Sequence, residues 1–560
     1  MRREVSVVNK KVCSFPILLA LLALLIGTCA VVFPASAQAA PTSTGSITVS
    51  GTVASSYDAY QIFSANVVDG DNDAKIATDL AWASDDVCDA ALPVLHSAGM
   101  PKSQTTAQEA AEWLNADSHL TSALSAQLAR SLQSSGAVPV ALNAGTTAEL
   151  PCGYWLIVAD DDAIAQDQAG TAPIMALVGG GAVTVKPKAA TPRVAKHVLE
   201  DGTAAWQKAA DATVGDDLYW RLSATVPAGL SAYDAYTVQF VDTMGAGLDP
   251  SRVAASMRVY AAAGAEGGFD AVACEGGDAN STPAKGWTDI TSQCNVSVEG
   301  NAFTVRTGDL IAALGGADAF AAGARVVAVY DAPLNGACNH GIAKGNPNEV
   351  YLRYPRSPLA DQSGDAGFTR TPSDDACADT WDLALTKRGS DGDKPLPGAV
   401  LSITDDRGRT LSADGTWDAE SKATVTTGED GRVTVSGVDS GKLEVRERKA
   451  PKGYTAFKGT RSVTVKADGL DVKQVAAAKP KLTITAESPL RADSADGSTG
   501  SLEASLINTP TGTPPSIFTG GFMPSTGDMA MYAAAAVAVV GAALIVVALL
   551  VKRGGGSHKE

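Results

Sequence analysis

Cysteine is the residue type that most directly predicts covalent chemistry in this sequence. The chain holds eight cysteines, and two of them, Cys13 and Cys29, fall in an amino-terminal segment that we expect to be removed. An even number in an exported chain favours disulfide bonds over metal or redox chemistry. Order along the chain suggests three pairs without fixing them: Cys88 with Cys152, Cys274 with Cys294, and Cys338 with Cys377.

The other reactive side chains form no catalytic or metal-binding pattern. The five histidines are scattered, without the spacing of a zinc site. An acidic loop at 69–73 starts like a calcium loop, but Leu80 stands where such a loop needs a closing glutamate. No nucleophile elbow, phosphate-binding loop or paired-carboxylate signature is present. We therefore expect no metal, no cofactor and no enzymatic activity on an external substrate.

The two ends of the chain carry the signals of an exported protein. Basic residues precede an apolar segment at 15–33, and the small residues after it predict a secretory signal peptide cleaved after Ala37 or Ala39. An apolar run at 530–551 is long enough to cross the roughly 30 Å core of a bilayer as a helix, and the basic pair 552–553 would hold the tail in the cytoplasm. The formal charge of −17, without a long basic cluster, argues against a nucleic-acid partner.

A pentapeptide stands just before that apolar run: Met523, Pro524, Ser525, Thr526 and Gly527. Taken alone, it is compatible with a proline-rich turn ahead of a single-pass membrane anchor. Together with the apolar run and the basic tail, it resembles the cell-wall sorting signal of Gram-positive surface proteins, with Met in place of the usual Leu. In that family a sortase cleaves between the threonine and the glycine, here Thr526 and Gly527, and passes the threonyl carbonyl to an amine.

The residues after a predicted strand at 183–185 offer such an amine. Lys186, Pro187 and Lys188 follow that strand, and a lysine pair at a β-edge by itself deters edge pairing. The segment also resembles the Tyr-Pro-Lys motif of Gram-positive shaft pilins, whose lysine is the acceptor for the pilus sortase. The resemblance implies that Lys188 has this role, and Lys186 in the tyrosine position remains the alternative. Attack on a thioester needs the neutral amine, which the sortase must provide with a base or by desolvation.

Three β-rich domains are expected between the two ends. In the first, strands at 47–49 and 154–158 accompany one helix. A capping box from Thr106 to Glu109 and leucines every four residues at 120–132 indicate that helix. The second domain resembles an immunoglobulin-like sandwich of the collagen-adhesin A type, with strands expected at 218–222, 236–240, 324–330 and 350–354.

The third domain resembles the related B type of sandwich. Its segment 443–454 is similar to the pilin E-box, and its closing strand is expected at 506–510. The stretch from about Val475 to Ser501 is longer than we expect between those two motifs. It predicts a surface insertion that is looped out.

In both sandwiches the resemblance implies one internal isopeptide bond. The members in the second domain are Lys196 on the first strand, Asn348 opening the last strand with Asn346 as the alternative, and Asp242 as the assisting acid. The members in the third domain are Lys387, Asn508 and Glu447. In such a bond the lysine amine attacks the asparagine carboxamide and ammonia leaves. Burial favours a neutral lysine and a protonated acid, and the acid can then move a proton to the leaving nitrogen.

The sequence therefore predicts a mainly β fold with tandem immunoglobulin-like sandwiches after an amino-terminal β-rich domain with a helix. The expected limits are a signal peptide at 1–39, an N-terminal pilin domain at 40–190, a middle isopeptide-forming domain at 191–380, a C-terminal B-type domain at 381–515, and a sorting signal at 516–560 with its transmembrane helix.

The resemblance is to the major shaft subunit of a sortase-assembled fimbria, of the type found in Actinomyces, Bifidobacterium and Corynebacterium. It implies a membrane-inserted precursor that ends in a cell-wall fimbria serving adhesion. The implied partners are a pilus-specific class C sortase, a wall-anchoring sortase, identical subunits, peptidoglycan, a tip adhesin and a host ligand. A monomeric wall-anchored adhesin and a minor or basal pilin remain the alternatives.

Overall fold

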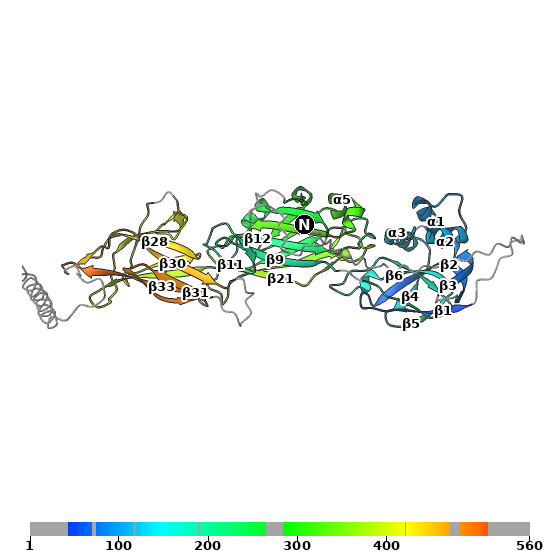
Figure 1. The fold of residues 1–560 in the computed structure, drawn as a ribbon, viewed down its shortest axis with the longest axis horizontal. Coiled ribbons are helices and arrows are strands. Elements are labelled where there is room, and N and C mark those ends of the chain that lie inside the picture. Colours follow the sequence, from blue (N-terminus) through cyan, green and yellow to red (C-terminus); the bar gives the residue numbers. More distant parts are fainter. Residues whose placement is uncertain are drawn as a thin grey trace, which may run out of the picture.

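A computed structural model of the chain describes residues 43–69, 74–116, 118–188, 191–264, 284–419, 422–470 and 481–512. These residues form three β-rich units arranged in a row (Figure 1), so the predicted mainly β fold is confirmed. The signal peptide, Cys274 and the whole sorting signal lie outside the described residues. Within them, no helix combines the length and the apolar character needed to span a membrane.

The first unit packs two sheets against each other. One sheet has the order β5-β1-β8 and the other β3-β2-β6-β7, with β4 paired to β2. Their bounds are β1 (Thr44–Val49), β2 (Ser56–Asp69), β3 (Lys75–Trp82), β4 (Val140–Asn143), β5 (Thr147–Pro151), β6 (Gly153–Ala159), β7 (Ile174–Val178) and β8 (Val183–Val185). The strands expected at 47–49, 154–158 and 183–185 are confirmed.

Three helices, rather than the one predicted, cover this unit (Figure 1): α1 (Asp85–Ser97), α2 (Ala107–Asn115) and α3 (Ser122–Gln133). The capping box of Thr106 and Glu109 is present at the start of α2. The single-helix prediction is wrong because Thr121 caps a new helix, accepting a hydrogen bond from the Leu124 N–H. Helix α1 was missed although Ser84 caps it in the same way.

The second unit is a sandwich of two larger sheets. The first sheet has the order β10-β9-β12-β18-β14-β15; the facing sheet has the order β11-β21-β19-β13-β17-β16, with β20 paired to β19. The bounds in the first sheet are β9 (Arg193–Glu200), β10 (Ala205–Gln207), β12 (Tyr219–Val226), β14 (Arg258–Ala263), β15 (Thr288–Asp289) and β18 (Ala324–Asp331). Those in the facing sheet are β11 (Ala209–Asp211), β13 (Gln239–Met244), β16 (Asn295–Glu299), β17 (Ala302–Arg306), β19 (Asn346–Pro355), β20 (Phe368–Arg370) and β21 (Asp374–Asp379).

Short helices α4 (Val253–Ser256), α5 (Leu310–Ala313) and α6 (Ala317–Phe320) complete the second unit. The strand that carries Asn348, β19, was expected to be the last of its domain. That expectation is wrong, because β20 and β21 follow it and both pair with it.

The third unit is a second sandwich. One sheet has the order β27-β22-β33-β29, with β32 on β33; the other has the order β25-β24-β23-β28-β30-β31, with β26 on β23. The bounds in the first are β22 (Trp381–Gly389), β27 (Arg432–Val438), β29 (Tyr454–Thr455), β32 (Leu490–Asp496) and β33 (Ser501–Pro510). Those in the second are β23 (Val400–Thr404), β24 (Thr410–Leu411), β25 (Trp417–Asp418), β26 (Val425–Thr426), β28 (Gly441–Lys449), β30 (Arg461–Asp468) and β31 (Lys481–Ala486).

The predicted surface insertion before the closing strand is wrong for the part that the structure describes, residues 481–501. Strand β31 pairs with β30 and strand β32 pairs with β33, so this segment extends both sheets. Leu482 and Leu490 anchor the two strands in the core of the unit, where their burial removes apolar surface from water.

Candidate functional site: two buried lysine–carboxylate–asparagine clusters

The second unit brings its three predicted residues together between its sheets. Lys196 projects from β9 in one sheet, whereas Asp242 on β13 and Asn348 on β19 come from the facing sheet. Met244 pairs with Asn348 across these two strands, and Asp242 pairs with Val350, so both polar side chains lie on the same face of the sheet. All three side chains are fully buried.

The Lys196 ammonium contacts the Asp242 carboxylate directly. A residue that sequence reasoning missed, Tyr330 on β18, completes the cluster. Lys196 Nζ donates to the Tyr330 hydroxyl at 2.8 Å, Asn348 Nδ2 donates to the same hydroxyl at 2.9 Å, and the hydroxyl donates to Asp242 Oδ2 at 3.2 Å. Among the described residues, Asp242 Oδ1 and Asn348 Oδ1 have no hydrogen-bond partner.

Burial pushes the lysine and the acid of this cluster toward their neutral forms. Desolvation lowers the pKa of Lys196 to about 8 although its attraction to Asp242 acts in the opposite direction. Desolvation also raises the pKa of Asp242, against the effect of Lys196 and Tyr330. A neutral amine is the form that can attack a carbonyl carbon, and a neutral acid is the form that can donate a proton.

The contacts of Asn346 argue against it as the alternative partner of Lys196. Asn346 is also buried, but its Nδ2 donates to the carbonyls of Asn339 and Ala378 at 2.9 and 3.0 Å. Its Oδ1 accepts from the Asn339 N–H at 2.8 Å. The hydrogen-bonding capacity of this side chain is therefore used away from the lysine, and the geometry favours Asn348.

The third unit gathers its predicted residues in a different way. Lys387 on β22 and Asn508 on β33 belong to neighbouring parallel strands, with Lys387 in register with Leu506. Glu447 comes from β28 in the facing sheet. The Lys387 ammonium lies 3.4 Å from Glu447 Oε1, and Asn508 Nδ2 donates to both carboxylate oxygens at 2.8 and 3.1 Å.

This second cluster is also closed to solvent, with Lys387 fully buried. Burial lowers the pKa of Lys387 to about 8, in spite of its attraction to Glu447. Glu447 Oε2 also accepts from the Phe457 N–H at 3.0 Å, which fixes the carboxylate. Here one glutamate contacts both the lysine and the asparagine, whereas in the second unit a tyrosine hydroxyl lies between them.

Lys186 and Lys188 lie just past the end of β8, an edge strand of the first unit. Strand β8 lies parallel to β1 at the edge of its sheet, and the Ser50 N–H donates to the Val185 carbonyl at 2.8 Å just before the two lysines. Both lysines are exposed. The described part of the chain gives neither of them an ion-pair partner, so either amine is accessible to another protein.

Two of the three predicted disulfides, Cys88–Cys152 and Cys338–Cys377, are wrong. Cys88 on α1 lines a surface groove of the helices, whereas Cys152 is buried beside Gly179, and both are free thiols. Cys338 is also free; it packs on the core of the second unit, whereas Cys377 packs on that of the third. The pairing of Cys294 with Cys274 stays a prediction, because Cys274 lies outside the described residues.

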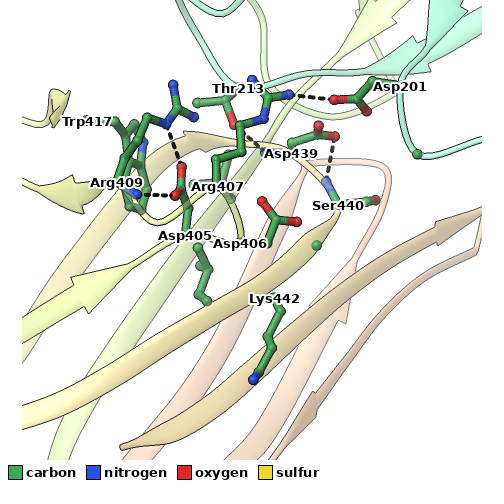
Figure 2. Close-up of a pocket in the computed structure, with 14 residues that line it drawn as sticks. Asp201, Thr213, Asp405, Asp406, Arg407, Arg409, Trp417, Asp439, Ser440 and Lys442 are labelled. Atoms are coloured by element: carbon green, nitrogen blue, oxygen red, sulfur yellow. Dashed lines mark hydrogen bonds and ion pairs between the residues drawn. The ribbon is translucent and has the colours of Figure 1, made fainter. Parts of the chain in front are cut away.

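A polar cavity of about 350 Å³ lies at the junction of the second and third units. Figure 2 shows Arg407 reaching Asp201 across the junction, and this ion pair measures 2.5 Å. Asp379, which lies near the charge of Asp211, is fully buried, and neither of its carboxylate oxygens has a hydrogen-bond partner among the described residues. No three potential ligand side chains in the part of the chain that the structure describes are grouped to hold a metal ion.

Comparison with known proteins finds similarity to a domain family, to a surface protein and to solved structures. Residues 382–479 match the family described as SpaA, prealbumin-like fold domain. The trypsin-resistant surface T6 protein of Streptococcus pyogenes serotype M6 is 29% identical over 129 residues, which is 22% of this chain and 22% of that protein. The matched stretch thus spans about a fifth of the length of that relative.

Two solved structures resemble this chain in the path of the backbone. The T6 backbone pilin of Streptococcus pyogenes serotype M6 has a TM-score of 0.46 at 17% identity, covering 84% of this chain and 98% of that chain. The full-length major pilin SpaD from Corynebacterium diphtheriae has a TM-score of 0.41 at 15% identity, covering 85% of this chain and 100% of that chain.

Proposed function

We propose that this chain, which is similar to Gram-positive backbone pilins, is the major structural subunit of a covalently polymerised cell-surface fimbria. A pilus-specific class C sortase cleaves after Thr526 and transfers the threonyl group to Lys188 of the next subunit. Repetition of this step gives a head-to-tail series, because contacts that do not close on themselves generate an open filament. A wall-anchoring sortase finally joins the polymer to peptidoglycan.

The observation that carries the proposal is the pair of buried lysine–carboxylate–asparagine clusters. A buried ion pair contributes little to stability over apolar packing, so two such clusters in successive sandwiches favour a chemical role. In each, Nζ of the lysine bonds to Cγ of the asparagine, the Cγ–Nδ2 bond breaks, and ammonia leaves. The product carries no charge, which removes the cost of keeping an ion in the core.

Crosslinked sandwiches suit a protein that bears load and meets proteases outside the cell. The T6 relative is named as a trypsin-resistant surface protein, and one amide tie per sandwich would give this chain the same property. The chain itself would be a substrate of sortases, and its own chemistry would be limited to one bond-forming event in each sandwich.

The rival functions differ in what they require of Lys188. A monomeric wall-anchored adhesin needs the same sandwiches and anchor but no acceptor lysine, and a minor or basal pilin is joined once without polymerising. The exposed position of Lys188 at the end of an edge strand favours the polymerising subunit.

The test is an immunoblot of denatured cell-wall extracts from cells that express the wild type, Lys188→Ala or Lys186→Ala. We expect a ladder of high-mass species in the wild type and in Lys186→Ala, and its loss in Lys188→Ala. A single wall-linked band in all three strains would refute the shaft function and support the adhesin. A ladder lost only in Lys186→Ala would move the acceptor role to that residue.

A further inference from the structure

We infer that the hydroxyl of Tyr330 is a catalytic proton relay for the isopeptide bond of the second unit, carrying a proton from the attacking nitrogen of Lys196 to the leaving nitrogen of Asn348. The inference rests on the proposed bond between those two residues. It assigns to the formation of that bond a further group, which contacts both reacting nitrogens.

The relay position follows from the contacts of one oxygen atom. Tyr330 Oη lies 2.8 Å from Lys196 Nζ and 2.9 Å from Asn348 Nδ2. These nitrogens are the one that gains a bond to carbon and the one that loses it. A hydroxyl can accept one proton while it donates another, so an atom in contact with both can move a proton between them in one step.

The third unit shows why the second one needs this group. There Glu447 contacts the asparagine nitrogen at 2.8 Å and the lysine nitrogen at 3.4 Å, so one carboxylate serves both reactants. The acid of the second unit is Asp242, whose side chain is one methylene shorter. It contacts Lys196 and the Tyr330 hydroxyl, whereas Asn348 Nδ2 donates to the tyrosine.

The steps balance without any further reactant. Neutral Lys196 attacks Cγ of Asn348 while protonated Asp242 supplies a proton to the amide oxygen. The attacking nitrogen, now with an excess proton, passes it to Tyr330 Oη. The tyrosine passes its own proton to Nδ2, which has become a basic amine in the tetrahedral intermediate. The Cγ–Nδ2 bond then breaks, ammonia leaves, and the proton on the former amide oxygen returns to Asp242.

The surroundings keep the phenol protonated and fixed. Burial next to Asp242 holds the pKa of Tyr330 well above its ordinary value, so the hydroxyl keeps the proton that it must hand on. The ring packs edge-on against Phe303 at 4.8 Å between centroids, and the side chain is fully buried. The ring is therefore held in place, and no bulk solvent competes for the hydroxyl.

The test times bond formation in Tyr330→Phe. The full chain is made by cell-free synthesis, stopped at intervals in denaturant and digested. Mass spectrometry then measures the linked peptide that contains Lys196 and Asn348 and is lighter by one ammonia. Tyr354→Phe is the matched control, since Tyr354 is buried in the same core and its hydroxyl has no partner among the described residues.

We expect Tyr330→Phe to slow this bond on the order of 100-fold, the usual size of a general acid–base contribution. The Lys387–Asn508 bond in the same molecules should keep its wild-type rate, and so should both bonds in Tyr354→Phe. Equal rates in the two tyrosine variants would overturn the relay while leaving the crosslink intact. Absence of the linked peptide in the wild type would instead refute the crosslink itself.

Two further measurements separate a relay from a merely structural role. The first is the double variant Tyr330→Phe with Asp242→Glu, which copies the arrangement around Glu447. It should form the Lys196–Asn348 bond at least about tenfold faster than Tyr330→Phe alone. An equal rate in the two variants would contradict the relay. If Tyr330→Phe fails to fold, the wild-type sequence can be made with 3-fluorotyrosine in place of every tyrosine. This change keeps the hydroxyl of Tyr330 in place within the wild-type fold and alters its acidity. The relay predicts a change of the Lys196–Asn348 rate alone, and unchanged rates for both bonds would refute it.

Discussion

Asn348 and Asn508 occupy different places in the strand order of their sandwiches. Asn508 lies on β33, the last strand of the third unit, which runs parallel to β22 and its Lys387. Asn348 lies on β19, and β21 follows before the chain leaves the second unit. A bond from Lys387 to Asn508 would therefore join the entering and leaving strands, whereas a bond from Lys196 to Asn348 would leave β21 outside the closed loop.

This difference predicts unequal behaviour under force. Pulling on the ends of a crosslinked chain should detach residues 349–379 of the second unit, an extension of about 100 Å at 3.3–3.6 Å per residue, and then stop at the covalent bond. The third unit should stay closed. Single-molecule stretching measures both extensions. The matched variant Lys196→Ala should let the whole second unit extend, and a wild type in which it never extends would contradict the assignment of Asn348.

Removal of the acid in the third unit should prevent its bond and destabilise its core. Glu447→Gln keeps the shape of the side chain but takes away the charge beside Lys387. After allowance for the mass change of the substitution itself, we expect the intact mass to exceed that of the wild type by one ammonia. The free energy of unfolding should fall by about 3–5 kcal/mol, because the crosslink is absent and Lys387 stays buried without the carboxylate that faces it. Glu444→Gln, on the exposed side of the same strand, is the control and should change neither quantity.

The acidic junction of the second and third units predicts a pH-dependent stability. Burial and the charge of Asp211 raise the pKa of Asp379 to about 7 and that of Glu200 to about 8. The native state therefore keeps protons that the unfolded state releases above about pH 4, and stability falls with pH in that range. The stabilisation is fully present below about pH 4 and is lost as the pH rises through about 7 to 8.

Asp379→Asn should reduce this dependence. At pH 8 it should stabilise the protein by roughly 2–4 kcal/mol, since it removes a buried charge without a partner, and at pH 5, where the native carboxyl keeps its proton, the gain should be smaller. Thermal unfolding at both pH values measures the difference. Asp318→Asn, an exposed carboxylate on α6, is the control. An Asp379→Asn variant that loses as much stability as the wild type between pH 5 and pH 8 would rule out this carboxyl as a source.

The resemblance of short motifs to those of pilin sandwiches identified residues far apart in the chain that the fold brings together. Lys196 and Asp242 make contact although 46 residues separate them, and Glu447 and Asn508 do so across 61 residues. Each lies on a strand, so the alternation of side chains between the two faces directs it into the core.

Tyr330 could not be singled out in the same way. Its strand is apolar at almost every position, with Val326 and Ala328 in one cluster and Val327 and Val329 in another. Where both faces of a strand are buried, alternation does not show which face a residue takes. The Cys88–Cys152 and Cys338–Cys377 disulfides failed for a related reason, because order along the chain says nothing about which core a cysteine joins.

The most direct measurement of the central claim is fragmentation mass spectrometry of protease digests of purified fimbriae. The account predicts a branched peptide in which the carbonyl of Thr526 is joined to Nζ of Lys188, together with Thr526 linked to peptidoglycan in the small fraction of subunits at the base. Finding Thr526 joined only to peptidoglycan, with Lys188 unmodified in every peptide, would contradict it.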